Sequence, residues 1–126
     1  MVGNAYVCKC SGKINEKEAQ KIANEAKKEG NDAYKRILLK GNAELTSDGA
    51  RALVKEGIYL IGVESQTVGP ESAPMEVHKI LLENEVVILE GVRLGEVTSG
   101  SYLLSCAPLN LKGLDGSPCR AILIKM

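Results

Sequence analysis

Short apolar runs, separated by amphipathic segments, mark most of this chain. Along Ala5–Cys10, every second residue is expected to face the same way, so that Ala5, Val7 and Lys9 alternate with Tyr6, Cys8 and Cys10. This period of two is typical of a β-strand. A further short strand is expected at 36–39, and continuous apolar runs follow at 58–63 and 86–89. Continuous runs of this kind are typical of strands that are buried on both faces, as in parallel sheets.

Three helices are expected between and beside these strands. Asn15 can cap the first helix, and Glu18 three places later completes a capping box. Thr46 or Ser47 is expected to cap the second helix, and Gly57 should end it. A third helix covers 75–82, so the chain from 36 to 89 has the order β-α-β-α-β. Parallel strands joined by right-handed crossovers are the natural result.

The pattern changes after the third helix. Strands are expected at 102–107, 109–112 and 119–125, and no helical segment separates them. Asp115-Gly116 is a turn signal, and Pro108 favours a bulge or an edge. This portion should be antiparallel, and the sequence therefore predicts a mixed α/β fold in a single domain of residues 1–126.

Composition narrows the classes of partner. Sixteen basic residues balance sixteen acidic ones, which gives no electrostatic reason to expect nucleic acid or an anionic membrane surface. No apolar run is long enough to cross a bilayer, and no signal-peptide pattern opens the sequence. The chain has no Phe and no Trp, so Ile, Leu, Val and Ala must build its core.

The cysteines have two interpretations. Cys8 and Cys10 form a lone Cys-x-Cys, whereas Cys106 and Cys119 stand apart. Tight zinc sites usually show two pairs at Cys-x-x-Cys spacing, so we expect reduced, strand-borne thiols in a cytoplasmic protein. The alternative is a metal site made by Cys8, Cys10 and the chain's one histidine, His78.

Candidate chemistry gathers at the expected ends of buried strands. His78 shares a helix face with Leu81 and Leu82 at offsets of three and four, so it should point inward or toward a cleft. Glu90 directly follows the run at 86–89, and Glu64 follows the run at 58–63. Ligands of open α/β sheets bind outside the carboxyl ends of the strands. A histidine and a carboxylate there suit a divalent metal or acid–base work. Two structural interpretations remain open: His78 is a histidine that forms only local hydrogen bonds, and Glu90 is a solvated strand end. For Glu64, a role in satisfying the hydrogen bonds of a loop is slightly favoured.

Other catalytic classes lack their motifs. The sequence has no Gly-x-Ser-x-Gly motif, no P-loop and no dinucleotide-binding fingerprint. No nucleophilic triad can be assembled around its one histidine. A hairpin turn explains the glycine-rich stretch at 113–118 without any bound phosphate.

Several motifs together resemble one enzyme family. The stretch 60–68 reads LIGVESQTV, 76–82 reads EVHKILL, 88–91 reads ILEG, 107–109 reads APL and 115–121 reads DGSPCRA. In this order they resemble the metal-dependent cyclase family, which includes kynurenine formamidase (arylformamidase) and related hydrolases of amide or lactam bonds. The resemblance is strongest from Ile58 onward, and it implies a swivelling β/β/α type of fold.

The resemblance also implies a site and a cofactor. The family's helix-borne histidine and the glutamate after the next strand correspond to His78 and Glu90, as catalytic residues and as metal ligands. A divalent metal, zinc or manganese, would then lower the pKa of its bound water and polarise the amide carbonyl. The family's main ligands come from an upstream segment, His-x-Gly-Thr-His-x-Asp-x-Pro, that this sequence lacks. The turn at 40–42 also reads KGN where the family often reads RTG.

Three expectations follow from that difference. The chain is either an incomplete part of a hydrolase that acts on a small-molecule amide, or a non-catalytic binding or assembly module of the same origin. It should bind zinc or manganese weakly on its own, because catalytic zinc normally has three protein ligands. It should also self-associate as a homo-oligomer or bind a second polypeptide that carries the missing motif, since uncharged strand edges near its C-terminus are open to pairing.

Overall fold

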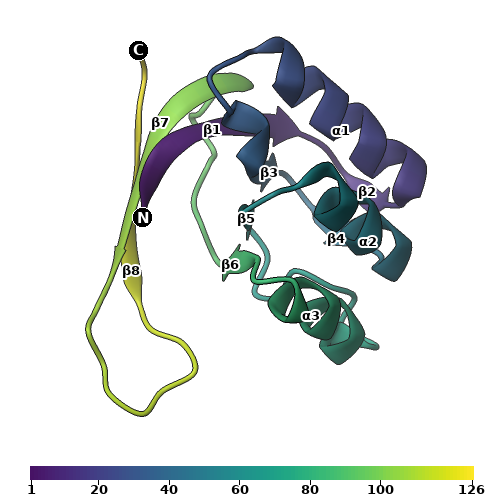
Figure 1. Cartoon of the computed structure of the whole chain (residues 1–126), viewed down its shortest axis with the longest axis vertical. Coiled ribbons are helices and arrows are strands. Elements are labelled where there is room, and N and C mark those ends of the chain that lie inside the picture. The colour runs from purple at the N-terminus through teal and green to yellow at the C-terminus, as the bar shows by residue number, and fades with distance from the viewer.

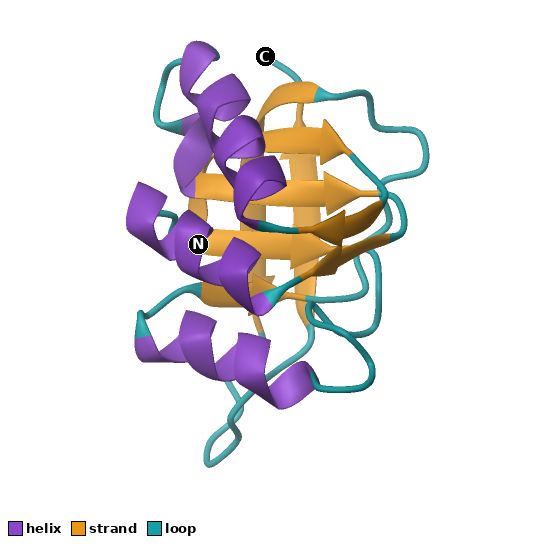
Figure 2. Ribbon diagram, turned by 90° about the vertical axis from the view of Figure 1, so that its right-hand side faces the viewer, coloured by secondary structure: helices purple, strands orange, loops and turns teal.

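Three helices pack against one face of a mixed six-stranded sheet in the computed structural model, which describes residues 1–126 (Figure 1). In chain order the elements are β1 (Val2–Lys9), β2 (Gly12–Ile14), α1 (Glu16–Lys28), a short 3-10 turn (Ala33–Lys35), β3 (Arg36–Lys40), β4 (Ala43–Leu45), α2 (Ser47–Glu56), β5 (Leu60–Val63), α3 (Pro74–Glu83), β6 (Val87–Leu89), β7 (Gly100–Pro108) and β8 (Cys119–Ile124). Figure 2 shows the helices together on one side of the strands.

The sheet has the order β6-β5-β3-β1-β7-β8. The first four strands in this order are parallel to one another, whereas β7 pairs antiparallel with β1 and β8 pairs antiparallel with β7. This arrangement confirms the predicted mixed α/β fold, with a parallel portion followed by antiparallel strands. It also sets the carboxyl ends of β3, β5 and β6 side by side at one edge of the sheet.

Local capping explains where the helices begin and end. The Asn15 side chain accepts a hydrogen bond from the amide of Glu18 at 3.0 Å, and the Thr46 hydroxyl accepts one from the amide of Gly49 at 3.1 Å. These bonds satisfy amide groups that have no partner inside the helix. Gly57 ends α2 in the left-handed region with φ of 86°, where a glycine is favoured.

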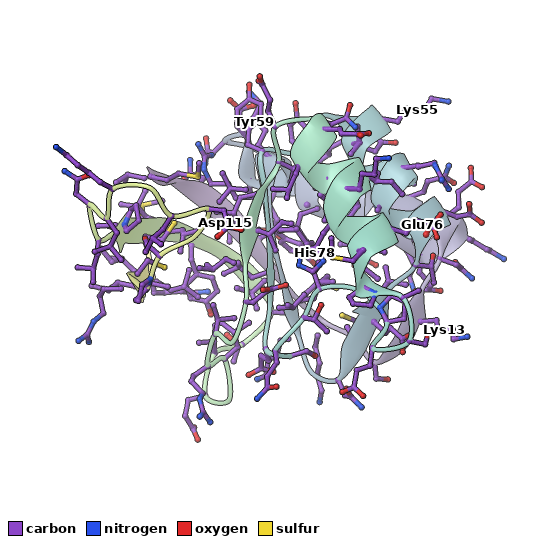
Figure 3. The ribbon with its side chains drawn as sticks, turned by 90° about the horizontal axis from the view of Figure 1, so that it is seen from below. Lys13, Lys55, Tyr59, Glu76, His78 and Asp115 are labelled. Atoms are coloured by element: carbon purple, nitrogen blue, oxygen red, sulfur yellow. The ribbon has the colours of Figure 1, made fainter.

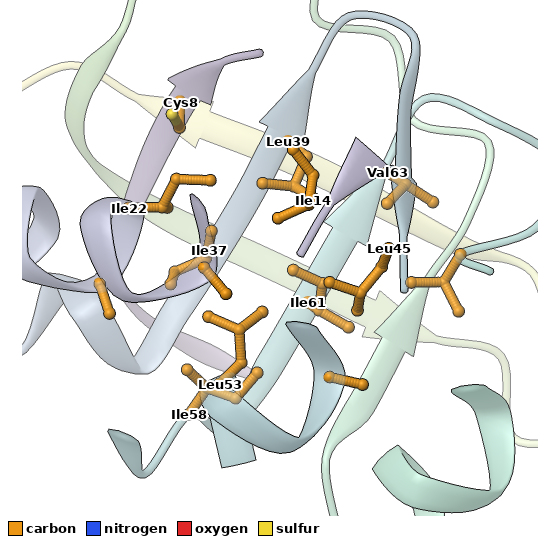
Figure 4. Packing of buried hydrophobic residues seen from close by; sticks show 14 of the residues in the cluster. Cys8, Ile14, Ile22, Ile37, Leu39, Leu45, Leu53, Ile58, Ile61 and Val63 are labelled. Atoms are coloured by element: carbon orange, nitrogen blue, oxygen red, sulfur yellow. The ribbon is translucent and has the colours of Figure 1, made fainter. Parts of the chain in front are cut away.

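Two hydrophobic clusters lie on the two faces of the sheet. The larger one fills the space between the helices and the strands, and Figure 4 shows Ile37, Ile61 and Leu53 meeting there. The smaller cluster lies on the opposite face, where Leu38 and Leu104 project from β3 and β7. No helix covers this second face, and part of its cover comes from the segment after β6, through the buried Leu94.

The structure corrects the prediction of a strand at 109–112, because those residues form part of a loop. The antiparallel pair ends where Pro108 lies opposite Cys119, and the next bond, from the Leu109 amide to the Pro118 carbonyl, closes the loop. Leu109 and Leu111 are exposed because no strand is available beside them. A second pairing was not predicted: β2 and β4 form a separate two-stranded parallel sheet.

No helix in the structure combines the length and the apolar character that crossing a bilayer would need.

Candidate functional site

The carboxyl ends of β5 and β6 carry the acidic residues that were singled out from the sequence. Glu64 follows Val63, the last residue of β5, and Glu90 follows Leu89, the last residue of β6. The two strands are neighbours in the sheet, and α3 packs beside β6. Both glutamates therefore lie at the edge where ligands of open parallel sheets bind.

His78 and Glu90 meet directly. The Nε2 atom of His78 lies 2.8 Å from Oε1 of Glu90, so the fold brings these two candidate residues together. In the view of Figure 3, His78 lies between its helix and the strands. Both side chains are only partly exposed, at 25% for His78 and 32% for Glu90. Solvent or a small ligand can therefore reach the pair from the exposed side.

Two backbone groups fix the orientation of this pair. The carbonyl oxygen of Pro74, one turn earlier in α3, lies 2.8 Å from Nδ1 of His78. The amide of Val68 donates a second hydrogen bond, of 3.0 Å, to Oε1 of Glu90. The histidine ring and the carboxylate are thus held by the helix and by the loop after β5, and neither depends on the other alone.

The contacts constrain where protons can be. A carbonyl oxygen can only accept, so Nδ1 of His78 carries a hydrogen and donates it to Pro74. A hydrogen bond between Nε2 and Oε1 then requires one more proton, either on the imidazole or on the Glu90 carboxyl. An imidazole and a carboxylate in this contact can exchange a proton between a nitrogen base and an oxygen base, an arrangement suited to general acid–base chemistry.

The residues present do not fit a complete catalytic metal site. His78 and Glu90 offer two ligands, and their nearest atoms face one another instead of a common point. No three His, Cys, Asp or Glu side chains come close enough together to hold an ion. The alternative of a metal site made by Cys8, Cys10 and His78 is therefore wrong. Metal ligation by His78 and Glu90 stays a prediction, and it would need ligands from outside this chain.

The four cysteines are free thiols. Cys8, Cys106 and Cys119 lie on strands, and Cys10 directly follows β1, in line with their prediction as small strand-borne hydrophobes. The neighbouring Cys10 thiol lowers the pKa of Cys8, whereas the Cys8 thiol and burial together raise the pKa of Cys10.

Glu64 has a structural role that sequence reasoning only partly anticipated. Its two carboxylate oxygens accept hydrogen bonds of 2.7 Å from the amides of Gly41 and Leu94. Lys40, which was not singled out, donates to the carbonyls of Gly95 and Val97 at 3.0 and 2.6 Å. Charged side chains from the ends of β3 and β5 therefore hold the segment that follows Glu90, as the loop interpretation of Glu64 required.

A cavity of about 720 Å³ opens beside Glu90 on the face of the sheet without helices. Its floor includes Leu38, Leu89 and Leu104 from the strands, and Arg93 contributes a charged group from the segment after β6. No sequence pattern indicates this cavity, because its walls come from strands, a loop and a hairpin that are far apart along the chain.

Known proteins resemble this chain in sequence and in fold. No protein-family model matches it. Cyclase-like protein 2 of Oryza sativa subsp. japonica is 43% identical over 82 residues, which cover 64% of this chain and 30% of the relative. Cyclase-like protein 3 of the same plant is 40% identical over 80 residues, which cover 62% of this chain and 30% of the relative.

Solved structures of proteins described as hydrolases resemble this chain in fold. A potential metal-dependent hydrolase with cyclase activity superposes with a TM-score of 0.80 at 26% identity, over 97% of this chain and 64% of that chain. A predicted metal-dependent hydrolase from Bacillus stearothermophilus gives a TM-score of 0.78 at 26% identity, over 97% of this chain and 63% of that chain. An isatin hydrolase at 17% identity, with a TM-score of 0.77 over 95% of this chain and 58% of that chain, shares the fold alone.

These comparisons confirm the resemblance to the cyclase family that the sequence motifs indicated. The region of similarity spans less than a third of the length of the curated relatives and about two-thirds of the length of the solved structures. The fold of this chain is thus the fold of part of a cyclase-family hydrolase.

Proposed function

We propose that this chain carries the histidine–glutamate part of a metal-dependent hydrolase that opens amide or lactam bonds of small molecules. The observation that carries the proposal is the contact of 2.8 Å between His78 and Glu90 at the carboxyl edge of the parallel strands. The similarity to solved hydrolases described as metal-dependent supports the reaction class.

The chain's own residues would supply proton transfer and a place for the substrate. With Nδ1 of His78 anchored on the Pro74 carbonyl, its Nε2 atom can pass a proton to and from Glu90 without turning the ring. Such a pair can accept a proton from an attacking water and return it to the leaving amine. The leucine floor of the cavity beside Glu90 can hold the hydrocarbon part of the substrate while the scissile bond lies near the pair.

The metal of such a hydrolase would be held mainly by groups outside this chain. His78 and Glu90 are too few to complete its coordination, so we expect activity only together with a polypeptide that supplies the family's His-x-Gly-Thr-His-x-Asp-x-Pro segment. A second candidate is a binding or assembly module without catalysis. The same observation favours it, because the direct His78–Glu90 contact satisfies both side chains without a metal.

A complementation assay tests the proposal. The purified chain would be mixed with a polypeptide that carries the upstream segment, in zinc or manganese, and hydrolysis of aryl formamide and lactam substrates would be followed. We expect hydrolysis in the mixture and not in either part, and a loss of at least a hundredfold for His78→Ala and for Glu90→Gln.

Glu76→Gln is the matched control for this assay. Glu76 lies on the same helix as His78 but is exposed, with 58% of its side chain accessible, and it pairs only with Arg51. This variant should keep full activity. Hydrolysis that is equally fast in the His78→Ala and Glu90→Gln mixtures would contradict the assigned roles. Binding of the added polypeptide without any hydrolysis would favour the non-catalytic module.

A further inference from the structure

The edge strand β8 combines an open edge with apolar side chains on both faces. Twelve large hydrophobic residues of the chain are exposed, and eight of them lie at the N-terminus of β1 or in the stretch from 109 to 126. These eight are Met1, Val2, Leu109, Leu111, Leu114, Ile122, Ile124 and Met126. Exposed apolar surface is thus concentrated around β8, the loop before it and the start of β1, which is typical of an interaction surface.

Hydrogen-bond direction shows which backbone groups of β8 are free. The amide of Cys106 donates to the Met1 carbonyl at 2.9 Å, so Cys106 turns its polar groups toward β1 and away from β8. Ala121 lies opposite Cys106. In antiparallel pairs the bonded positions alternate, so Ala121, Cys119 and Leu123 direct their amides and carbonyls to the open edge. Ile122 and Ile124 direct theirs to β7.

We propose that β8 pairs antiparallel with β8 of a second copy of this chain, about a twofold axis near Ala121 and Ile122. The two six-stranded sheets would then join into one continuous sheet. A twofold axis makes each copy both donor and acceptor, so the free groups of Ala121 and its neighbours find partners on the identical strand.

Charge permits this pairing. Arg120 is the only charged residue between Cys119 and Ile124, and with the axis at Ala121 or Ile122 it lies opposite Ile122 or Ile124 of the copy. No like charges are therefore opposed across the new pair, and the chain as a whole has a net charge of zero. No proline or acidic residue protects the edge from Cys119 to Ile124.

Exposed apolar side chains on and beside β8 enlarge the contact. Ile122, Ile124 and Met126 lie on β8 or next to it, and Leu109, Leu111 and Leu114 lie in the loop that leads into it. One partner of a standard interface buries about 800 Å². The new contact would also extend an existing surface, because Ala121 and Leu123 line the cavity beside Glu90. The same residues of the copy would lengthen the apolar wall of that cavity.

A competing occupant of this edge is the additional third of the polypeptide that the similar solved structures contain. That alternative predicts a chain that stays monomeric on its own. Self-pairing is favoured by the fit of β8 to its own copy, and it does not depend on the proposed hydrolase function.

The molar mass of the chain and of one proline variant tests the pairing. It would be measured by light scattering after size-exclusion chromatography. Ala121→Pro removes an amide that only the open edge uses, so the fold of one chain should survive. We expect the unaltered chain to have twice the mass of one 13.5-kDa chain, and Ala121→Pro to have the mass of one. Ala121→Val, which keeps the amide, is the control and should remain a dimer.

Hydrogen exchange of the unaltered chain gives a second measurement that needs no variant. The amides of Ala121 and Leu123 should be protected at high concentration and exchange at least tenfold faster after dilution to monomer. Those of Ile122 and Ile124, bonded to β7, should remain protected throughout. The proposal would be overturned if the chain is a monomer at every concentration. It would also be overturned if the exchange rates of the Ala121 and Leu123 amides do not change on dilution.

Discussion

Replacing Glu64 with alanine tests how the site is held in place. The Glu64 carboxylate accepts hydrogen bonds of 2.7 Å from the amides of Gly41 and Leu94, which join the turn after β3 to the segment after β6. Hydrogen bonds to a charged group contribute about 1.5–3 kcal/mol each. Glu64 is only partly buried, so we take the lower end of that range for each of the two bonds and expect Glu64→Ala to reduce the free energy of unfolding by about 3 kcal/mol.

Urea unfolding followed by circular dichroism measures this change. For a chain of this length, a loss of about 3 kcal/mol lowers the melting temperature by roughly 10 °C. Glu96→Ala is the control, because Glu96 is an exposed carboxylate of the same segment, and its loss should change stability by less than about 0.5 kcal/mol. A loss below about 1 kcal/mol for Glu64→Ala would refute the view that this carboxylate joins the two loops.

Three further predictions concern metal, packing and thiol chemistry. Zinc or manganese should raise the melting temperature of the isolated chain little, and a large rise that survives His78→Ala would point to the cysteines. Gly49→Ala should destabilise the chain by about 2 kcal/mol or more in urea unfolding, despite the higher helix propensity of alanine, because the added Cβ would overlap the carbonyl oxygen of Ile14. Gly116→Ala meets no neighbouring atom and should be close to neutral; equal losses in both variants would contradict the packing argument. Burial raises the pKa of the Cys106 thiol, so less thiolate exists at pH 8, and alkylation measured by mass spectrometry should be at least tenfold slower than in the denatured chain.

Local signals allowed much of the fold to be predicted from the sequence. The caps at Asn15 and Thr46 depend on side chains three residues from the amides that they bind, so the sequence contains both partners of each bond. Apolar runs such as 58–63 placed the buried strands for a similar reason, since burial on both faces requires every residue to be apolar.

The failed and missing predictions involve partners far apart along the chain. The strand expected at 109–112 has the right composition, yet no neighbouring strand lies beside it. The strands β2 and β4 have three residues each, which is too short for a periodic pattern to be recognised. Their pairing depends on the fold bringing Gly12 beside Ala43.

The candidate site divides in the same way. His78 and Glu90 were found because a helix face and a strand end are local features, and the family resemblance joined them. A loop role was expected for Glu64, but its partners and the contacts of Lys40 could not be predicted, because the backbone groups that they bind have no signature in the sequence.

A double-mutant cycle between His78 and Glu90 tests the central claim most directly, because it asks whether the two side chains act as one pair in the isolated chain. Unfolding free energies would be measured at pH 7 with a metal chelator for the unaltered chain, His78→Ala, Glu90→Ala and the double variant. Groups in direct contact show coupling of about 0.5–3 kcal/mol, and we predict about 1–2 kcal/mol for this partly exposed pair. Losses that add to within about 0.3 kcal/mol would show that the pair does not form in solution, and the account of the site would be contradicted.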